Sequence, residues 1–289
     1  MQTKKLITGL TLLLLIVGAP LYIFNQATDQ TNLVEKETKQ NDAATEEKTV
    51  PIKKHAQRTS PKLFIHNEQQ VTKHFYQSRH ITAIGDSLTQ GVGDETKQGG
   101  YVGALEQIMT QANTEASFDN FGVRGNRSDQ LLKRLQQEDM IASIKQADIV
   151  FITIGANDVM GVLKENITNL QMEAFEKARV DYEKRLHKIL TNIRTVNANT
   201  KIYLLGFYNP FGQYFKDIEE LKLIADNWNK TGKEVVTNYE NSSFIPISDL
   251  FSNTDDNLFA EDNFHPNQVG YERIAERIFE VLKTEQERG

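Results

Sequence analysis

Short apolar runs alternate with longer amphipathic segments along the chain after residue 78. Most of these runs are continuous, as in strands that are covered by helices on both faces of a sheet. The predicted strands are His80–Gly85, Ser117–Phe121, Asp148–Ile154, Lys201–Phe207 and Phe244–Ile247. The pattern is clearest in Asp148–Ile154 and weakest in Ser117–Phe121, where only Phe118 and Phe121 are apolar.

Segments with helical periodicity separate these strands. The predicted helices are Tyr101–Ala112, Asp129–Gln137, Leu170–Val196, Ile218–Tyr239 and Gln268–Lys283, with Ser128 as a candidate N-cap. Strands that alternate with helices imply parallel βαβ units. We therefore predict an α/β domain of three layers with a mostly parallel five-stranded sheet, whose core is about 79–285.

Polar motifs follow three of the predicted strands. Gly85–Leu88 follows the first, Gly155–Asp158 follows the third, and a loop with Asp262 and His265 follows the fifth. Each motif alone is typical of an ordinary turn or helix cap. In open parallel sheets, however, ligands bind at the carboxyl ends of the strands, where all three motifs would meet. Their coincidence at one edge favours a catalytic site.

The residue types at this edge suit acyl transfer. A serine hydroxyl such as that of Ser87 needs an adjacent base to act as a nucleophile. His265 is the histidine that lies in a strand-end loop, with Asp262 three residues before it. A carboxylate there can fix the imidazole tautomer and stabilise the imidazolium. The amide of Asn157 can donate a hydrogen bond to an oxyanion.

These motifs resemble those of the SGNH, or GDSL-type, hydrolases, a family of serine esterases and acylhydrolases. Gly85–Leu88 resembles the first block, Asn120–Ser128 the second, Gly155–Asp158 the third, and Asp262 with His265 the last. The resemblance covers about 79–285, and the four short blocks occur in the family's order. It implies a flavodoxin-like fold.

The resemblance also implies a role for each residue. Ser87 would be the nucleophile, His265 the general base, and Asp262 the residue that orients His265. The oxyanion hole would consist of the backbone N–H of Ser87, the backbone N–H of Gly125 and the side chain of Asn157. Gly122 is the second choice for the glycine of this hole.

Apolar side chains near the same edge are candidates for substrate binding. They are Leu88, Tyr101, Tyr208, Phe211 and Phe264, in a region that also holds Phe207, Tyr214 and Phe215. Such residues could line a pocket for an acyl group or a sugar. Ordinary core and loop packing is the alternative.

Composition narrows the function further. There are 33 basic and 39 acidic residues, a net charge of −6, and no long basic run, so we do not expect a nucleic-acid partner. The absence of cysteine excludes disulfides and a cysteine nucleophile. No metal-ligand spacing, phosphate loop or nicotinamide fingerprint occurs, so no cofactor or metal is predicted.

The N-terminal part of the chain has a different character. Leu6–Phe24 carries no charge, and as a helix it would span about 28 Å, close to the hydrocarbon core of a bilayer at about 30 Å. Lys4 and Lys5 precede it, which predicts a cytoplasmic N-terminus (1–5) and an extracytoplasmic domain. A cleaved signal peptide, which would give a secreted protein, is the alternative. Residues 25–60 are polar and read as a flexible tether before a hydrolase domain at 61–289.

The sequence therefore favours a membrane-anchored, extracytoplasmic bacterial serine esterase. Its ester substrate would be a lipid acyl ester or an O-acetyl group of an envelope glycan. A thioesterase or peptidase that uses the same site remains an alternative. So does a binding module that keeps the fold without catalysis.

Overall fold

The computed structural model describes residues 79–166, 170–212, 218–252, 254 and 256–288, all of them within one compact unit, Phe75–Gly289. The predicted membrane span (6–24) and the predicted tether (25–60) lie outside the described residues. Among the helices that are described, none is long and apolar enough to cross a membrane.

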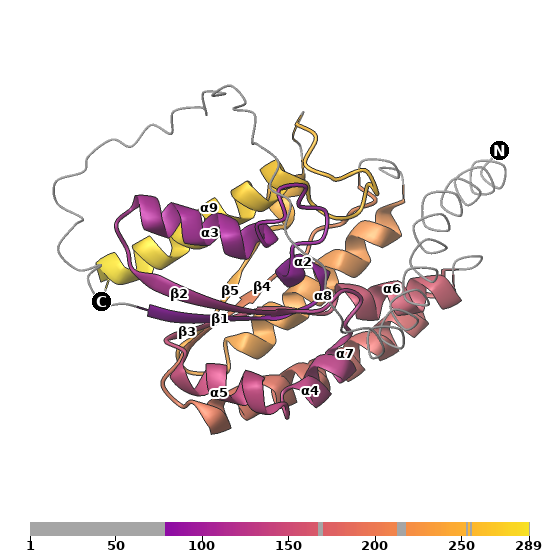
Figure 1. Ribbon diagram of the computed structural model, residues 1–289. Coiled ribbons are helices and arrows are strands. Elements are labelled where there is room, and N and C mark those ends of the chain that lie inside the picture. Colours follow the sequence, from indigo (N-terminus) through magenta and orange to yellow (C-terminus); the bar gives the residue numbers. More distant parts are fainter. Residues whose placement is uncertain (1–78, 167–169, 213–217, 253, 255, 289) are drawn as a thin grey trace, which may run out of the picture. The chain divides into compact units, whose positions relative to one another are not determined.

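A parallel sheet forms the centre of the domain (Figure 1). Its strands are β1 (Arg79–Gly85), β2 (Ala116–Gly122), β3 (Ile149–Thr153), β4 (Lys201–Leu205) and β5 (Ser242–Ile245). They lie in the order β2-β1-β3-β4-β5, and each pair of neighbours is parallel. This is the strand order of flavodoxin-like folds. The predicted α/β class and five-stranded sheet are confirmed.

More helices are present than the periodicity predicts, and the predicted ones differ from the observed ones by up to five residues at an end. The observed helices are α2 (Ser87–Gln90), α3 (Gly100–Gln111), α4 (Ser128–Arg134), α5 (Glu138–Gln146), α6 (Ala156–Glu165), α7 (Met172–Val196), α8 (Glu219–Val236) and α9 (Gln268–Arg288), with a 3₁₀ turn η1 (Ser248–Phe251). The sequence analysis does not predict α2, α5, α6 or η1. α2 and η1 are single turns, and α6 begins inside a motif that otherwise reads as a loop.

The prediction that Ser128 caps the second helix is wrong. Ser128 is the first residue of α4, and the N-cap is Arg127. The Arg127 backbone N–H donates to Oε1 of Gln130 at 2.9 Å. The hydroxyl of Ser128 is used elsewhere, because it donates to Asp158 on α6.

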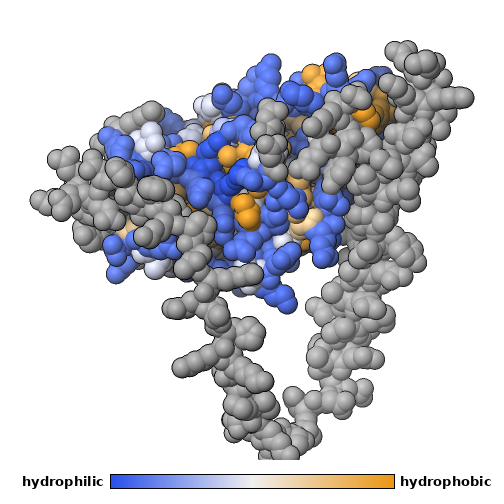
Figure 2. Space-filling view, turned by 90° about the horizontal axis from the view of Figure 1, so that it is seen from above, coloured by the Kyte–Doolittle hydropathy of each residue, from blue (hydrophilic) through white to orange (hydrophobic). Residues whose placement is uncertain are grey.

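Helices cover both faces of the sheet (Figure 1). α3 and α9 lie on one face, while α4, α5 and α7 lie on the other. Successive side chains of a strand point to opposite faces of the sheet. Ile81 and Ala83 on β1 therefore pack in the hydrophobic cluster with α3 and α9. The hydroxyl of Thr82, on the other face, forms a hydrogen bond of 2.6 Å with the hydroxyl of Ser143 on α5. The described residues visible from above are mainly hydrophilic, with a few hydrophobic patches among them (Figure 2), while the largest fully buried side chains are aromatic and aliphatic.

The register of the strands brings their carboxyl ends together. Gly85 pairs with Gly122 on one side and with Thr153 on the other. Thr153 pairs with Leu205, which in turn pairs with Ile245. The loops that follow these strands therefore emerge at one edge of the sheet.

Candidate active site

Ser87 is the first residue of α2, immediately after β1. Gly85 has a φ of 151°, and a Cβ at this position would lie 2.2 Å from the carbonyl oxygen of Thr153, so glycine is required for the close approach of β1 and β3. Asp86 caps the helix by accepting a hydrogen bond from the Leu88 N–H at 3.0 Å. Because the first N–H groups of a helix have no intrahelical partner, the N–H of Ser87 is suited to bind an anion.

The carboxyl of Asp86, next to Ser87, is buried. It accepts a hydrogen bond from the Thr153 hydroxyl at 3.0 Å, and that hydroxyl is 2.7 Å from the hydroxyl of Thr89. Burial raises the pKa of Asp86 from 3.8 to about 7, because the charged form is poorly solvated there. Asp86 thus connects β1, α2 and β3.

His265 contacts Ser87, although the two residues are 178 positions apart in the sequence. Its Nε2 lies 3.0 Å from the Ser87 Oγ, and its Nδ1 lies 2.5 Å from an Asp262 carboxylate oxygen. With Nδ1–H donating to Asp262, Nε2 is left as the acceptor for the serine proton. The imidazole is largely buried, with 7% of the residue exposed, so bulk water does not compete strongly for this contact.

The Asp262 carboxylate remains charged in this position. Burial alone would raise its pKa, but the hydrogen bond and charge of His265, together with the backbone N–H groups of His265 and Phe264, lower the pKa of Asp262 to about 2. The three-residue spacing makes this possible, because the same carboxylate binds the backbone and the ring of His265. A carboxylate that stays charged beside Nδ1 would stabilise an imidazolium formed by proton transfer to Nε2.

Two contacts hold the histidine loop against the rest of the site. The Tyr208 hydroxyl, on the loop after β4, donates to the Phe264 carbonyl at 2.9 Å. Gly93, on the loop after α2, has a φ of 94°, and a Cβ there would lie 3.0 Å from the Cβ of His265 and 2.5 Å from the Pro266 carbonyl oxygen. A side chain at Gly93 would therefore push the histidine loop away from Ser87.

Candidate oxyanion donors lie after β2 and β3: Gly125 in the loop after β2, and Asn157 in the first turn of α6. Gly125 has a φ of 77°, a conformation that favours glycine. Gly122 is less suitable as the donor, because its N–H already donates to the Asn120 side chain at 2.9 Å. The Asn157 amide donates to the Asn126 carbonyl at 3.1 Å, next to Gly125. Since an amide carries two N–H groups, Asn157 retains a second one for a ligand.

A buried ionic network joins the start of α4, after the loop with Gly125, to the start of α6. Asp158, next to Asn157, accepts hydrogen bonds from the Ser128 N–H at 2.9 Å and from the Ser128 hydroxyl at 2.6 Å. Arg185 on α7 donates to the same hydroxyl at 2.6 Å and to Asp158 at 3.1 Å. Burial raises the pKa of Asp158, which the Ser128 hydrogen bonds and the Arg185 charge counteract. The sequence analysis does not predict Ser128 or Arg185 as part of the site, because nothing in their local pattern marks long-range partners.

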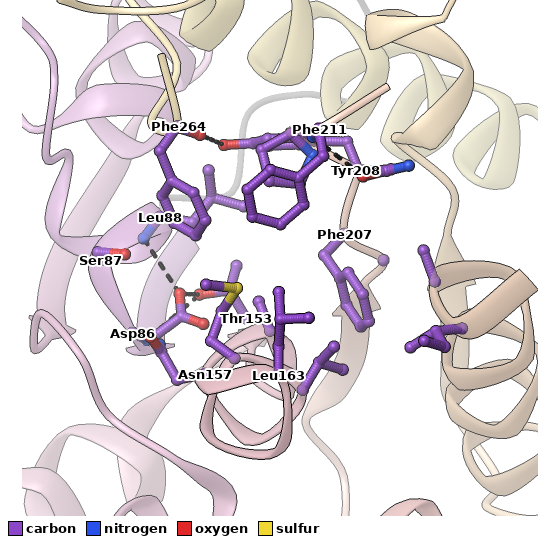
Figure 3. Close-up of a pocket in the computed structure, with 18 of the residues that line it drawn as sticks. Asp86, Ser87, Leu88, Thr153, Asn157, Leu163, Phe207, Tyr208, Phe211 and Phe264 are labelled. Carbon is purple, nitrogen blue, oxygen red and sulfur yellow. Dashed lines mark hydrogen bonds between the residues drawn. The ribbon is translucent and has the colours of Figure 1, made fainter. Parts of the chain in front are cut away.

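The pocket beside Ser87 is largely apolar and holds about 850 Å³ of empty space, including its open mouth (Figure 3). The polar residues of its lining are Asp86, Ser87, Thr153, Asn157, Asn209 and His265. Its apolar lining includes Leu88, Val159, Met160, Leu163, Phe175, Leu205, Phe207, Tyr208, Phe211, Leu221, Ile224, Ala225 and Phe264. Of the predicted substrate-binding residues, the pocket therefore brings together Leu88, Tyr208, Phe211 and Phe264.

Tyr101 is placed elsewhere. It does not line this pocket, and it is completely buried on the inner side of α3. Its ring meets Phe151 edge-on at 6.5 Å between centroids, and its hydroxyl lies 3.0 Å from the Thr89 hydroxyl. Its contacts are core packing, the alternative left open by the sequence. Tyr214 and Phe215 lie outside the described residues.

The sequence analysis also misses the pocket residues contributed by α6, α7 and α8. Leu163, Phe175 and Ile224 occupy apolar positions of amphipathic helices, which are indistinguishable in sequence from core positions. Only the packing of the helices shows that these side chains face a cavity.

Comparison with known proteins agrees with this geometry. A family model described as "GDSL-like Lipase/Acylhydrolase family" matches residues 83–273. "Uncharacterized protein YpmR" of Bacillus subtilis is 37% identical over 209 residues, which are 71% of this chain and 82% of the relative. "Spore germination lipase LipC" of Bacillus licheniformis is 28% identical over 205 residues, 68% of this chain and 93% of the relative.

A solved structure is similar as well. The lipase Lip_vut3 from a goat rumen metagenome superimposes with a TM-score of 0.62 at 26% identity, covering 68% of this chain and 94% of its own. The resemblance inferred from the motifs is thus confirmed at the level of the family. The chain belongs to the GDSL-like lipase/acylhydrolase (SGNH) family of ester-cleaving hydrolases.

Proposed function

We propose that this protein hydrolyses carboxylic esters with an apolar acyl chain, with Ser87 as nucleophile, His265 as general base and Asp262 as its orienting carboxylate. The observation that carries the proposal is the 3.0 Å contact between Ser87 Oγ and His265 Nε2. It lies at the polar end of a pocket that is otherwise apolar.

In the first half of the reaction, Ser87 Oγ bonds to the ester carbonyl carbon while its proton passes to Nε2 of His265. The carbonyl electron pair moves onto oxygen, and this oxyanion accepts hydrogen bonds from the Ser87 N–H, the Gly125 N–H and the Asn157 amide. When the carbonyl reforms, the bond to the alcohol oxygen breaks. The alcohol leaves with the proton from His265, and an acyl-enzyme remains.

In the second half, water takes the place of the alcohol. His265 accepts a proton from water as the water oxygen bonds to the acyl carbon. The bond to Ser87 then breaks, and the imidazolium returns its proton to Ser87 Oγ. The carboxylic acid is released, and the free enzyme is restored without any cofactor.

The pocket lining favours an acyl chain over an acetyl group. Each methylene that is transferred from water to an apolar site contributes about 0.8 kcal/mol. An acetyl ester would place one methyl group near Ser87 and would leave the surfaces of Leu163 and Ile224 without a partner. The relatives named as lipases support the same choice. O-acetyl glycans, thioesters and simple ligand binding are the other outcomes of the test.

The test is a hydrolysis screen of the full chain. It compares p-nitrophenyl esters from acetate to palmitate with acetylated xylan and an acyl-thioester, each with wild type and Ser87→Ala. We expect the highest kcat/KM for an ester with a chain longer than butyrate, and loss of activity in Ser87→Ala. Activity confined to acetylated glycan would overturn the acyl assignment. Binding without turnover of any compound would favour the binding module.

Attachment to the outer face of a cell membrane is also part of the proposal. It is supported by the uncharged stretch Leu6–Phe24 and by Lys4 and Lys5 before it. Fractionation of cells that produce the full chain, followed by N-terminal sequencing of the product, tests it. A full-length product in the membrane fraction is expected. A shortened product that is free in the medium would instead show a cleaved signal peptide.

A further inference from the structure

The pocket beside Ser87 is adjacent to a second, smaller hollow. That hollow is lined by Met172, Phe175, Glu176, Arg179, Ile224, Asn227 and Trp228. Phe175 on α7 and Ile224 on α8 line both spaces. Their side chains therefore stand between the two hollows, at the side of the main pocket that is formed by α7 and α8.

Both residues of this partition are firmly held. Phe175 is 2% exposed and Ile224 is 3% exposed. α7 and α8 pack against each other, and Tyr182 on α7 stacks on Trp228 of α8 with 5.0 Å between ring centroids. The partition is thus part of a packed helix pair, and its position does not depend on a surface loop.

The two sides of the partition differ in chemistry. On the pocket side, Leu163, Leu221 and Ala225 are apolar neighbours. On the far side, Arg179 forms an ion pair with Glu176. Met172 and Trp228 also line the far hollow, but an apolar chain that passed the partition would remove water from the Glu176–Arg179 ion pair, which is unfavourable. The partition separates a region that suits an acyl chain from one that does not.

From this arrangement we infer that Phe175 and Ile224 form the end wall of the acyl site and set the longest chain that the enzyme accepts. The inference rests on the proposed ester hydrolysis at Ser87. Chains shorter than the pocket leave apolar surface unburied, and each added methylene raises kcat/KM about fourfold until the wall is reached. Beyond that length, the chain has to bend back or leave its end in water, so the gain stops.

The test is the chain-length profile of kcat/KM for p-nitrophenyl esters from acetate to palmitate, measured with the full chain. Phe175→Ala should shift the optimum to longer esters, with about a fourfold gain for each additional methylene that the vacated space accommodates. Phe175→Leu keeps more of the packing and should give a smaller shift in the same direction. Ala225→Leu fills the pocket before the wall and should shift the optimum to shorter esters.

A matched control separates an open wall from a general loosening of the helices. Met172 lines the second hollow but not the pocket, so Met172→Ala should leave the profile of wild type unchanged. An optimum that stays at the wild-type length in Phe175→Leu and Ala225→Leu would overturn the inference while leaving ester hydrolysis intact. Hydrolysis that persists in Ser87→Ala would instead remove the proposed function on which the inference rests.

Discussion

Asp158 holds Ser128 by two hydrogen bonds, one to its backbone N–H at 2.9 Å and one to its hydroxyl at 2.6 Å. Asp158 follows Asn157 on α6, and Ser128 begins α4 directly after the loop that carries Gly125. Through this pair, the loop that carries Gly125 and the first turn of α6, which carries Asn157, are fixed to each other. Arg185 on α7 donates hydrogen bonds to both residues of the pair, to the Ser128 hydroxyl and to the Asp158 carboxylate.

Removal of the Ser128 hydroxyl should therefore affect both stability and catalysis. Ser128→Ala leaves the buried Asp158 and Arg185 without one of their partners, which costs about 1–3 kcal/mol of unfolding free energy. Because the donors are then held less rigidly, kcat should fall more than KM rises. Chemical denaturation and steady-state kinetics on one soluble ester measure the two effects.

Arg185→Met should give the same split between kcat and KM, with partial recovery in Arg185→Lys. Arg194→Met is the matched control, because Arg194 also projects from α7 but binds the carbonyls of Thr200 and Glu240, away from Ser87. It should lower stability and leave kcat near the wild-type value. Equal kinetic losses in Arg185→Met and Arg194→Met would mean that the network has no specific link to the site.

Asn157→Ala should lower kcat by about 10²–10³-fold, the usual loss for one oxyanion donor. KM should change little, because the donor acts mainly on charge that develops in the transition state. Steady-state kinetics on the ester preferred by wild type provides the measurement. An effect restricted to KM would show that Asn157 binds the ground state instead.

His265→Ala should cost more activity than Asp262→Ala. Without the imidazole no group accepts the serine proton, a loss of roughly 10⁶-fold, whereas loss of the orienting carboxylate costs roughly 10⁴-fold in comparable triads. Since the pKa of Asp262 is lowered to about 2, its carboxylate stays charged throughout the pH range of an assay. Wild-type activity in His265→Ala would exclude this residue as the base.

The buried Asp86 should make stability depend on pH. Its pKa rises from 3.8 to about 7 on folding, so between these values the native state holds a proton that the unfolded chain has lost. The free energy of unfolding should therefore fall as pH rises through this window, and stay level beyond it. Asp86→Asn preserves a good N-cap and should remove the part of this slope that Asp86 contributes. Urea unfolding of both proteins at several pH values gives the comparison; parallel curves would contradict the assignment.

Sequence patterns predicted the layers, and which polar residues come together at the site, better than the pocket. A strand such as the predicted Asp148–Ile154 can be predicted from sequence because a strand that is buried on both faces needs a continuous run of apolar residues. The sequence also indicates a site with Ser87, Asp262 and His265, because few residues in strand-end loops have side chains suited to acyl transfer. Their motifs also occur in the order of a known family. By contrast, Phe175 and Tyr101 are both buried aromatic residues on amphipathic helices. Only tertiary packing decides that Phe175 lines a cavity and that Tyr101 packs in the core.

Ser128 illustrates a second limit of sequence patterns. A serine at the start of a helix is a frequent N-cap, and this preference predicts a local role. In the folded domain, its hydroxyl donates a hydrogen bond to Asp158 and accepts one from Arg185, and both residues are far away in the chain. Local propensity cannot represent such partners, so the link that Ser128 makes between the starts of α4 and α6 becomes visible only in the structure.

The central claim is that His265 activates the hydroxyl of Ser87, and covalent labelling tests it most directly. A fluorophosphonate probe reacts at a useful rate only with an activated serine. We expect intact-mass analysis to show one adduct on the wild-type chain and peptide mapping to place it on Ser87, with no adduct on Ser87→Ala and strongly slowed labelling of His265→Ala. Labelling of Ser87→Ala as fast as wild type, or an adduct on another serine, would contradict the account.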